Sequence, residues 1–452
     1  MNKRIKRVLI ANRGEIAVRV IRACKELGLE TVQVYSQADR DTLAVKLADH
    51  SVCIGAPKSA ASYLNIPFII SAAKMYGADA IHPGYGFLSE NAEFARLCAE
   101  NEIIFVGPSD KVISLMGDKA TARKMAMEAG VPCTPGSEGV LDDVSAARRK
   151  ADELGYPVIL KASAGGGGRG MRIVRNEAEF DRQFQEAVRE AKACFNDGSV
   201  YLERYLTRIR HIEIQVLSDG HQTLHLGERD CSVQRRNQKL LEESPSPVLD
   251  PSIRSAMGEA AVRLCNHVGY TNAGTIEFIF DESTRQFYFM EMNTRIQVEH
   301  PVSEEITGID IVKEQLRIAD GQPLGIAQRN VTFTGHAIEC RINAEDPDRD
   351  FSPNPGLVTR YLAPGGPGIR VDSHLYDGYQ VPPYYDSLLA KIVTWGATRE
   401  EAIARMLRAL GELKIDGLKT TAPFHERLLA HDAFRNGQIH TTFVEQLLRE
   451  ET

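Results

Sequence analysis

Short apolar runs alternate with amphipathic helical stretches near the N-terminus, and this alternation limits the folds that the chain can adopt. Residues 7–12 form an apolar run of the buried-strand type, and residues 15–27 place their apolar side chains on one helical stripe. The pattern returns with a strand-like run at 78–82 and a helical stretch at 89–100. Because repeated β-α-β units assemble a parallel sheet with helices on both faces, we expect an α/β domain over residues 1–115.

The rest of the chain follows a different pattern. A helix is predicted at 177–193, and alternating strands follow it, among them 211–216 and 287–293. Hairpins and helices in this order predict an α+β arrangement rather than a continuation of the parallel sheet. We expect this second domain to cover residues 116–330 and a third domain to cover residues 331–452.

Composition and charge exclude several classes of protein. The 452 residues carry a net charge of −7, so no basic excess indicates nucleic acid or an anionic membrane surface as a partner. The longest apolar runs, such as 66–73, are far shorter than the roughly 20 residues of a membrane span, and no signal peptide is recognisable. The eight cysteines include no Cys-x-x-Cys pair, which argues against a zinc site or a disulfide framework. We therefore expect a cytoplasmic protein with reduced thiols.

A glycine tract is the strongest single feature. Five of the six residues at 165–170 are glycine, and such a tract is costly in backbone entropy unless a function needs the bare backbone. Consecutive N–H groups there can close over a polyphosphate, with positive charge supplied by Lys161 and Arg169. The alternative is an ordinary flexible surface loop, but the strands predicted on both sides favour a mobile phosphate lid. The spacing is not that of a P-loop.

Two acidic residues are expected to face each other in a hairpin that ends at Asn293. If Asp281 pairs with the residue six positions later, Glu277 lies opposite Glu291, and Asn293 projects to the same face. Like charges in an apolar hairpin are destabilising unless a cation lies between them, and two carboxylates with an amide oxygen suit magnesium. The alternative is a solvated hairpin face, but the neighbouring Phe and Met residues argue against it.

The segment after this hairpin carries a cation, an amide and a carboxylate. In an extended conformation Arg295, Gln297 and Glu299 share one face. Next to a metal–nucleotide site, such a set can hold a small oxyanion and remove its proton. The alternative is a structural salt bridge within a strand.

Other polar residues are less informative. The cationic stretch 229–239 is interpreted as a connection between strands and as a candidate anion contact. Arg341 lies in a strand-like segment, where it is either paired and half-buried or directed into a cleft. His82, His211 and His300 are each more typical of satisfied structural histidines than of ligands.

Together these segments resemble the biotin carboxylases of the ATP-grasp superfamily. The similar segments are Ile10–Ala17, Ile81–Asn91, Met116–Lys119, the glycine tract, Glu228–Ser232, Glu291–Pro301 and Pro383–Ser387. The Met-Asn-Thr-Arg-Ile-Gln-Val-Glu-His-Pro string within Glu291–Pro301 is highly specific to these enzymes. The resemblance implies an ATP-grasp fold with a lid at about 133–205, a Rossmann-like N-terminal domain and a C-terminal biotin carboxylase domain.

The resemblance also implies a reaction. ATP phosphorylates bicarbonate to carboxyphosphate, which carboxylates the ureido nitrogen of biotin and releases ADP and phosphate. The chain contains no Ala-Met-Lys-Met biotinylation motif, so we expect biotin on a separate carrier protein and a separate carboxyltransferase. Acetyl-CoA carboxylase in fatty-acid synthesis is the commonest setting for such a protein. Pyruvate, propionyl-CoA, methylcrotonyl-CoA and urea carboxylases are alternatives, and a homodimer is usual in the family.

The nucleotide-binding residues follow from the same resemblance. Those implied at the phosphates are Lys119 and Lys161, with Gly165, Gly166, Gly167 and Gly168 as the lid. Those implied at the adenine and the ribose are Glu203, Arg204, Tyr205, Leu206, His211 and Gln234. The implied ligands of magnesium or manganese are Glu277, Glu291 and Asn293.

The remaining site residues are those of bicarbonate and biotin. The implied bicarbonate contacts are Lys239, Arg295, Gln297 and the backbone of Val298. Glu299 is implied to be the base, Arg341 to stabilise the enolate-like biotin, and Tyr85 and Gly86 to approach the biotin ring. Asn237 departs from the family pattern, which often has His at this position.

Two other functions remain as alternatives. Another ATP-grasp ligase that activates a carboxylate for amide formation is disfavoured by Arg295–Glu299 and Arg341. A nicotinamide-dependent oxidoreductase would use the N-terminal domain, but residues 11–17 contain only Gly14 where the dinucleotide fingerprint requires three glycines.

Overall fold

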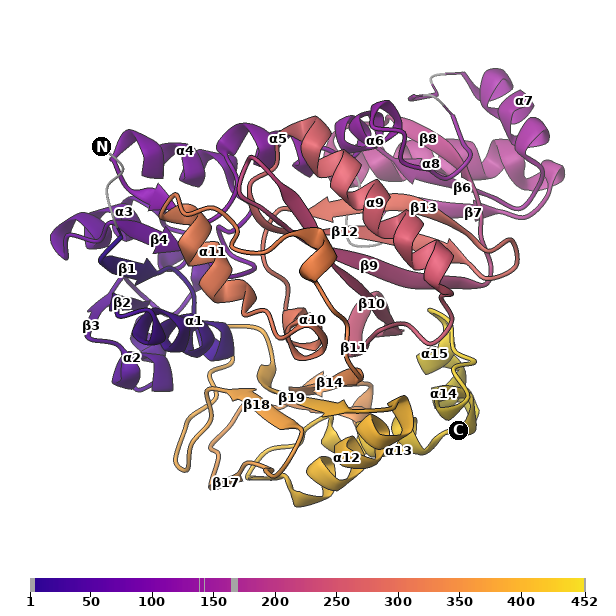
Figure 1. Ribbon diagram of the computed structural model, residues 1–452. Coiled ribbons are helices and arrows are strands. Elements are labelled where there is room, and N and C mark those ends of the chain that lie inside the picture. The colour runs from indigo at the N-terminus through magenta and orange to yellow at the C-terminus, as the bar shows by residue number, and fades with distance from the viewer. Residues whose placement is uncertain (1–4, 138, 142, 164–169, 451–452) are drawn as a thin grey trace.

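The N-terminal part of the computed structural model is a parallel sheet covered by helices, as the alternating pattern predicts (Figure 1). The model describes residues 5–137, 139–141, 143–163 and 170–450. The strand order is β3-β2-β1-β4-β5, and every pairing is parallel. The strands are β1 (Arg7–Ile10), β2 (Glu30–Tyr35), β3 (His50–Cys53), β4 (Ala80–His82) and β5 (Ile104–Phe105).

Several helices of this part begin at residues whose side chains cap them. The side chains of Asn65 and Asn91 each accept a hydrogen bond from the backbone N–H three residues later, which satisfies a donor that the first helical turn leaves free. Asn91 thus makes the fourth helix begin three residues after the predicted Ser89. The helices are α1 (Gly14–Glu26), α2 (Leu43–Leu47), α3 (Ile66–Met75), α4 (Ala92–Glu100), α5 (Asp110–Gly117) and α6 (Lys119–Glu128).

A small α+β unit follows. Its sheet has the order β7-β6-β8 and consists of β6 (Val158–Ala162), β7 (Met171–Val174) and β8 (Val200–Arg204). The helices α7 (Val144–Leu154) and α8 (Phe180–Phe195) cover it with buried Ala and Phe side chains. The two strands expected beside the glycine tract are therefore present, whereas Gly165, Gly166, Gly167 and Gly168 lie outside the described residues.

The centre of the molecule is one antiparallel sheet with the order β13-β12-β9-β10-β11-β14-β19-β18. Its strands are β9 (Ile209–Ser218), β10 (Thr223–Arg235), β11 (Gln238–Ser244), β12 (Asn272–Asp281), β13 (Gln286–Asn293), β14 (His336–Asn343), β18 (Ile369–Ser373) and β19 (Leu388–Gly396). Two short ribbons are β15 (Glu345–Asp346) with β16 (Ser352–Pro353) and β17 (Arg360–Leu362) with β20 (Lys414–Asp416). The sheet crosses the position where the second and third domains were predicted to meet, because β11 pairs with β14.

Helices cover both faces of the central sheet. On β9, Ile212, Ile214 and Val216 pack beneath α9 (Pro251–Val268). The intervening side chains, Glu213 and Gln215, point to the opposite face, as the two-residue period of a strand requires. That face carries α10 (His300–Thr307) and α11 (Ile311–Ala319). The C-terminal helices are α12 (Arg399–Glu412), α13 (Ala422–Ala430), α14 (Asp432–Arg435) and α15 (Phe443–Glu450).

Among the described residues, no helix combines the length and the apolar character needed to cross a membrane.

Candidate active site

A cavity of about 960 Å³ lies where the N-terminal sheet, the small α+β unit and the central sheet meet. Tyr85 comes from the N-terminal part, Lys161 from β6, Glu277 from β12 and Arg341 from β14. Drug-sized ligands occupy pockets of roughly 300–1,000 Å³. The cavity therefore lies at the large end of the range for a small-molecule site.

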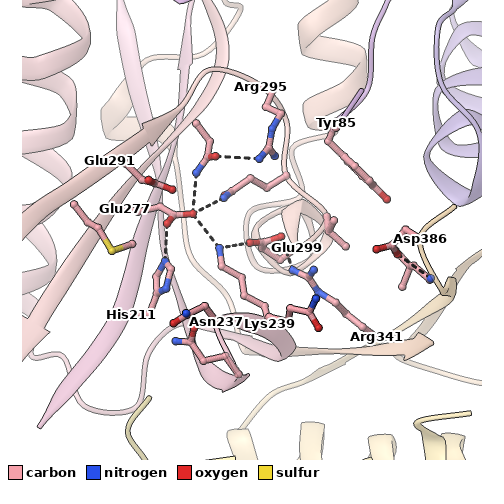
Figure 2. Close-up of a pocket in the computed structure, with 18 of the residues that line it drawn as sticks. Tyr85, His211, Asn237, Lys239, Glu277, Glu291, Arg295, Glu299, Arg341 and Asp386 are labelled. Carbon is pink, nitrogen blue, oxygen red and sulfur yellow. Dashed lines mark hydrogen bonds and ion pairs between the residues drawn. The ribbon is translucent and has the colours of Figure 1, made fainter. Parts of the chain in front are cut away.

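The β12–β13 hairpin brings two carboxylates into register (Figure 2). Asp281 pairs with Gln286, so the register assumed from the sequence was wrong by one residue. Met290 is an extra, unpaired residue on β13, and this bulge shifts the register back, so that Glu277 lies opposite Glu291 as predicted. The facing pair thus depends on a bulge that the alternating pattern did not indicate.

Glu277 is buried among donors. Its Oε1 accepts hydrogen bonds from Lys239 Nζ at 3.1 Å, Asn293 Nδ2 at 2.8 Å and Gln297 Nε2 at 2.8 Å. Its Oε2 lies 2.9 Å from His211 Nε2. Burial alone would raise the pKa of Glu277, but Lys239 and His211 outweigh burial and hold this pKa well below its ordinary value. An ionised carboxylate of this kind is a suitable ligand for a hard divalent cation.

Glu299 lies between two cations (Figure 2). Its Oε1 is 2.6 Å from Lys239 Nζ, and its Oε2 is 2.9 Å from Arg341 Nη2. The same guanidinium also binds Glu242, with 2.6 Å between Nε and Oε1. Burial opposes ionisation, yet Lys239, Arg341 and then Arg229 keep the pKa of Glu299 well below its ordinary value. The carboxylate is therefore ionised, as a general base must be.

The segment that carries Arg295, Gln297 and Glu299 is not extended. It consists of bends and a turn that lead into α10, which corrects the expectation of a shared strand face. All three side chains nevertheless line the cavity. Arg295 is fixed by Glu90, 2.8 Å from its Nε, and by the Oδ1 of Asn293, 3.0 Å from its Nη2.

The expected loop at 229–239 is also wrong, because most of it belongs to strands. β10 runs through to Arg235, and only Arg236 and Asn237 form the turn before β11. Lys239 therefore projects from a strand, and its side chain reaches Glu213, Glu277 and Glu299. A Lys surrounded by three buried carboxylates is a fixed part of the site rather than a solvated charge.

At the end of the cavity where the sequence predicts the nucleotide, the lining includes Lys119, Lys161, Glu203, His211 and Gln234. Lys119 Nζ is 3.5 Å from Glu291 Oε2, and Lys161 forms a salt bridge with Glu203. The side chains or backbone of Arg204, Tyr205 and Leu206 are not part of the lining, although they follow Glu203 directly.

At the other end, the lining includes Tyr85, Gly86, Val298, Arg341 and Asp386. The hydroxyl of Tyr85 donates to the buried Glu15. Tyr85, Arg341 and Asp386 surround the same part of the cavity in Figure 2.

The sequence interpretation missed several lining residues. Arg123 follows Lys119 by four positions on α6, and its Nη1 is 3.1 Å from Glu203 Oε1. Since side chains four apart share a helical face, this spacing was a usable signal. Asp386 and Tyr384 lie in the segment Pro383–Ser387, which resembles the biotin carboxylases, and this resemblance was a usable signal for them.

The fold and the site together define an ATP-grasp enzyme. A charged cavity lies between the N-terminal parallel sheet, the small α+β unit and the central antiparallel sheet. Family models match the chain almost throughout: "Biotin carboxylase, N-terminal domain" at residues 4–113, "Carbamoyl-phosphate synthase L chain, ATP binding domain" at 118–327, and "Biotin carboxylase C-terminal domain" at 339–446.

Known proteins with similar sequences or structures agree. Biotin carboxylase 1 of Bacillus subtilis is 58% identical over 442 residues, which is 98% of each chain. One of the pyruvate carboxylase subunits of Methanothermobacter thermautotrophicus is 52% identical, and the match covers 98% of this chain and 90% of that one. The biotin carboxylase domain of the Hydrogenobacter thermophilus 2-oxoglutarate carboxylase superposes with a TM-score of 0.91 at 52% identity, with 98% of each chain covered. The chain belongs to the biotin carboxylase family.

Proposed function

We propose that this protein uses ATP to carboxylate biotin with bicarbonate, through carboxyphosphate, and releases ADP and phosphate. Family membership supports this, and the Hydrogenobacter thermophilus relative was solved with MgADP, ADP and bicarbonate. The observation that carries the proposal is the pair Glu277 and Glu291 beside Glu299, which itself lies between Lys239 and Arg341. These groups suit a metal–triphosphate and an adjoining small anion.

In this proposal the hairpin carboxylates and the Asn293 amide oxygen hold magnesium or manganese, since such ions prefer oxygen ligands. When bound, the ion offsets negative charge on the phosphates. Lys119 and Lys161 contact the phosphates beneath the lid of Gly165–Gly168. His211 and Gln234 lie near the ribose, and the linker Glu203, Arg204, Tyr205 and Leu206 meets adenine.

Bicarbonate is proposed to bind between Lys239, Arg295, Gln297 and the backbone of Val298. Glu299 removes its proton, and the resulting oxyanion attacks the γ-phosphorus of ATP, with ADP as the leaving group. In the structure Lys239 and Arg341 both lower the pKa of Glu299, which makes it a weak base. The negative charges of the phosphates and bicarbonate draw on the same cations, so substrate binding makes Glu299 more basic.

Biotin is proposed to enter from the side of Tyr85 and Gly86, where Arg341 stabilises its enolate-like form. We propose that biotin arrives on a separate carrier protein, that a separate carboxyltransferase uses the product, and that the protein acts as a homodimer in the cytoplasm. The related Hydrogenobacter thermophilus domain is a dimer. We propose three domains, which cover residues 1–115, 116–330 and 331–452. The second domain contains the lid at about 133–205.

Acetyl-CoA carboxylase is the proposed setting, with pyruvate carboxylase as the second candidate. The second is favoured by the 52% identity to the pyruvate carboxylase relative. Capture of the biotinylated partner, followed by transfer assays with acetyl-CoA and with pyruvate, distinguishes the two.

The function itself is tested by ADP release. The full rate is expected to require both bicarbonate and biotin, and Glu299→Gln is expected to abolish most of it. Glu291→Ala is expected to weaken use of MgATP while circular dichroism stays unchanged. A Glu299→Gln enzyme with normal turnover would show that another group is the base.

A further inference from the structure

The turn before α10 holds two consecutive peptide carbonyls on its buried side. The carbonyl oxygen of Gln297 accepts a hydrogen bond from His300 Nδ1 at 2.8 Å and a longer one, at 3.3 Å, from the backbone N–H of the same residue. The carbonyl oxygen of Val298 accepts one from Lys391 Nζ at 2.8 Å. The side chains of His300 and Lys391 are both fully buried. Two side chains from different elements, α10 and β19, thus fix two neighbouring peptide planes.

The fixed carbonyls determine where the N–H groups of the same peptides point. Both peptides are trans, and a trans peptide carries its C=O and N–H on opposite sides. The N–H groups of Val298 and Glu299 therefore point away from His300 and Lys391, and both residues line the cavity. In the part of the chain that the structure describes, neither N–H has a protein acceptor. Two adjacent donors of this kind suit a small oxyanion.

Besides the Gln297 carbonyl, the His300 ring has Glu304 as a polar neighbour, and the Oε2 of Glu304 lies 3.9 Å from Nε2. Burial, and then the charges of Lys391 and Arg19, hold the pKa of His300 well below its ordinary value, so the ring is neutral with a single N–H. That hydrogen is on Nδ1, because the Gln297 carbonyl can only accept. The Nε2 atom has no hydrogen-bond partner among the described residues.

Lys391 has a second set of contacts. Its Nζ lies 3.3 Å from Glu15 Oε1 and 3.9 Å from Asp372 Oδ2. These buried carboxylates keep the ammonium group charged, and a charged donor binds a carbonyl more strongly than a neutral donor does. The polarised Val298 carbonyl in turn strengthens the Glu299 N–H as a donor.

We propose that His300 and Lys391 are positioning residues that hold the Val298 and Glu299 N–H groups toward bicarbonate. This inference rests on the proposed function, and it adds the Glu299 N–H as a second backbone contact to the anion. This positioning role does not involve the nucleotide end of the cavity. Loss of either side chain is therefore expected to change the KM for bicarbonate and not the KM for MgATP.

The test compares His300→Ala with His300→Asn by steady-state ADP release, because an Asn side-chain amide keeps a donor close to the position of Nδ1. His300→Ala is expected to raise the KM for bicarbonate roughly tenfold, the value of one hydrogen bond to a charged group. The KM for MgATP is expected to stay within about twofold, and His300→Asn to recover most of the loss. Lys391→Met tests the second carbonyl contact and is expected to act in the same direction.

The design separates positioning from folding. A KM does not depend on the concentration of active enzyme, so partial misfolding of a variant leaves the comparison valid. An unchanged bicarbonate KM in His300→Ala, or equal values for the Ala and Asn variants, would overturn the positioning role. If ADP release by the wild-type protein did not depend on bicarbonate, the proposed function would be overturned, and the inference with it.

Discussion

Arg229 shows how the site is built from buried charge. Its guanidinium is fully buried and makes hydrogen bonds to Glu213, Gln215, Thr275, Gln297 and Ser303. All five of its N–H groups are therefore used, which is the full capacity of the side chain. Gln297 is a proposed bicarbonate contact, and Glu213 also pairs with Lys239. The guanidinium therefore links the central sheet to the turn before α10.

Arg229→Met is expected to destabilise the protein by about 3–5 kcal/mol, because it leaves the carboxylate of Glu213 partly unpaired in the interior. Thermal or chemical denaturation measures the change. The control is Arg236→Met in the turn that follows the same strand, where the side chain is 68% exposed and pairs with Asp350. That surface pair is expected to contribute less than about 1 kcal/mol. Equal losses in the two variants would contradict the role given to the buried guanidinium.

Glu243 makes stability depend on pH. Burial opposes ionisation, but His336 and Arg399 lower the pKa of Glu243 to about 2. A pKa below the ordinary value stabilises the folded state above that ordinary value, and the stabilisation is lost as the pH falls. The free-energy difference between wild type and Glu243→Gln is therefore expected to narrow by about 1 kcal/mol from about pH 7 to about pH 4. Urea denaturation at several pH values measures it, and a constant difference would contradict the assignment.

At the scale of elements, the β12–β13 hairpin depends on its bulge. Without the bulge, Met290 itself would lie opposite Glu277, and Glu291 and the residues after it would each turn to the opposite face. The pairing of Glu277 with Glu291 is therefore a property of the hairpin and not of either residue alone.

Insertion of one Ala after Met290 is expected to abolish MgATP-dependent activity, because it moves the strand beyond the bulge by one position and turns Glu291 and Asn293 away from Glu277. Met290→Ala keeps the bulge and is expected to retain most activity. ADP-release assays, with circular dichroism to confirm folding, compare the two. A folded insertion variant with normal activity would show that the facing carboxylates are not needed.

The positions of strands and helices were predictable from their periodicity. The register of paired strands and the direction of individual side chains were not. Residues 15–27 gave α1 within one residue at each end, because their apolar stripe matches the helical period. No sequence pattern marks the bulge at Met290. The predicted pairing of Asp281 was therefore wrong by one residue, although the predicted pairing of Glu277 with Glu291 was correct. Likewise Arg229 looked like part of a solvated charged run, because sequence does not show that all its donors are satisfied by distant strands.

At the scale of the whole molecule, the cavity exists only because three parts of the chain meet. Glu15 and Tyr85 come from the N-terminal part, and Lys161 and Glu203 come from the small α+β unit. Arg341 comes from β14 of the central sheet. The sequence motifs indicated these residues separately, and the resemblance to biotin carboxylases grouped them. Their distances, and the role of Lys391 beneath the reactive turn, required the fold.

The most direct test of the account is transfer of label from radiolabelled bicarbonate to biotin by the purified protein with MgATP. We expect acid-labile carboxybiotin, formed in step with ADP and dependent on bicarbonate, biotin and MgATP. ADP formation without any label in biotin, or labelled biotin in the absence of ATP, would contradict it.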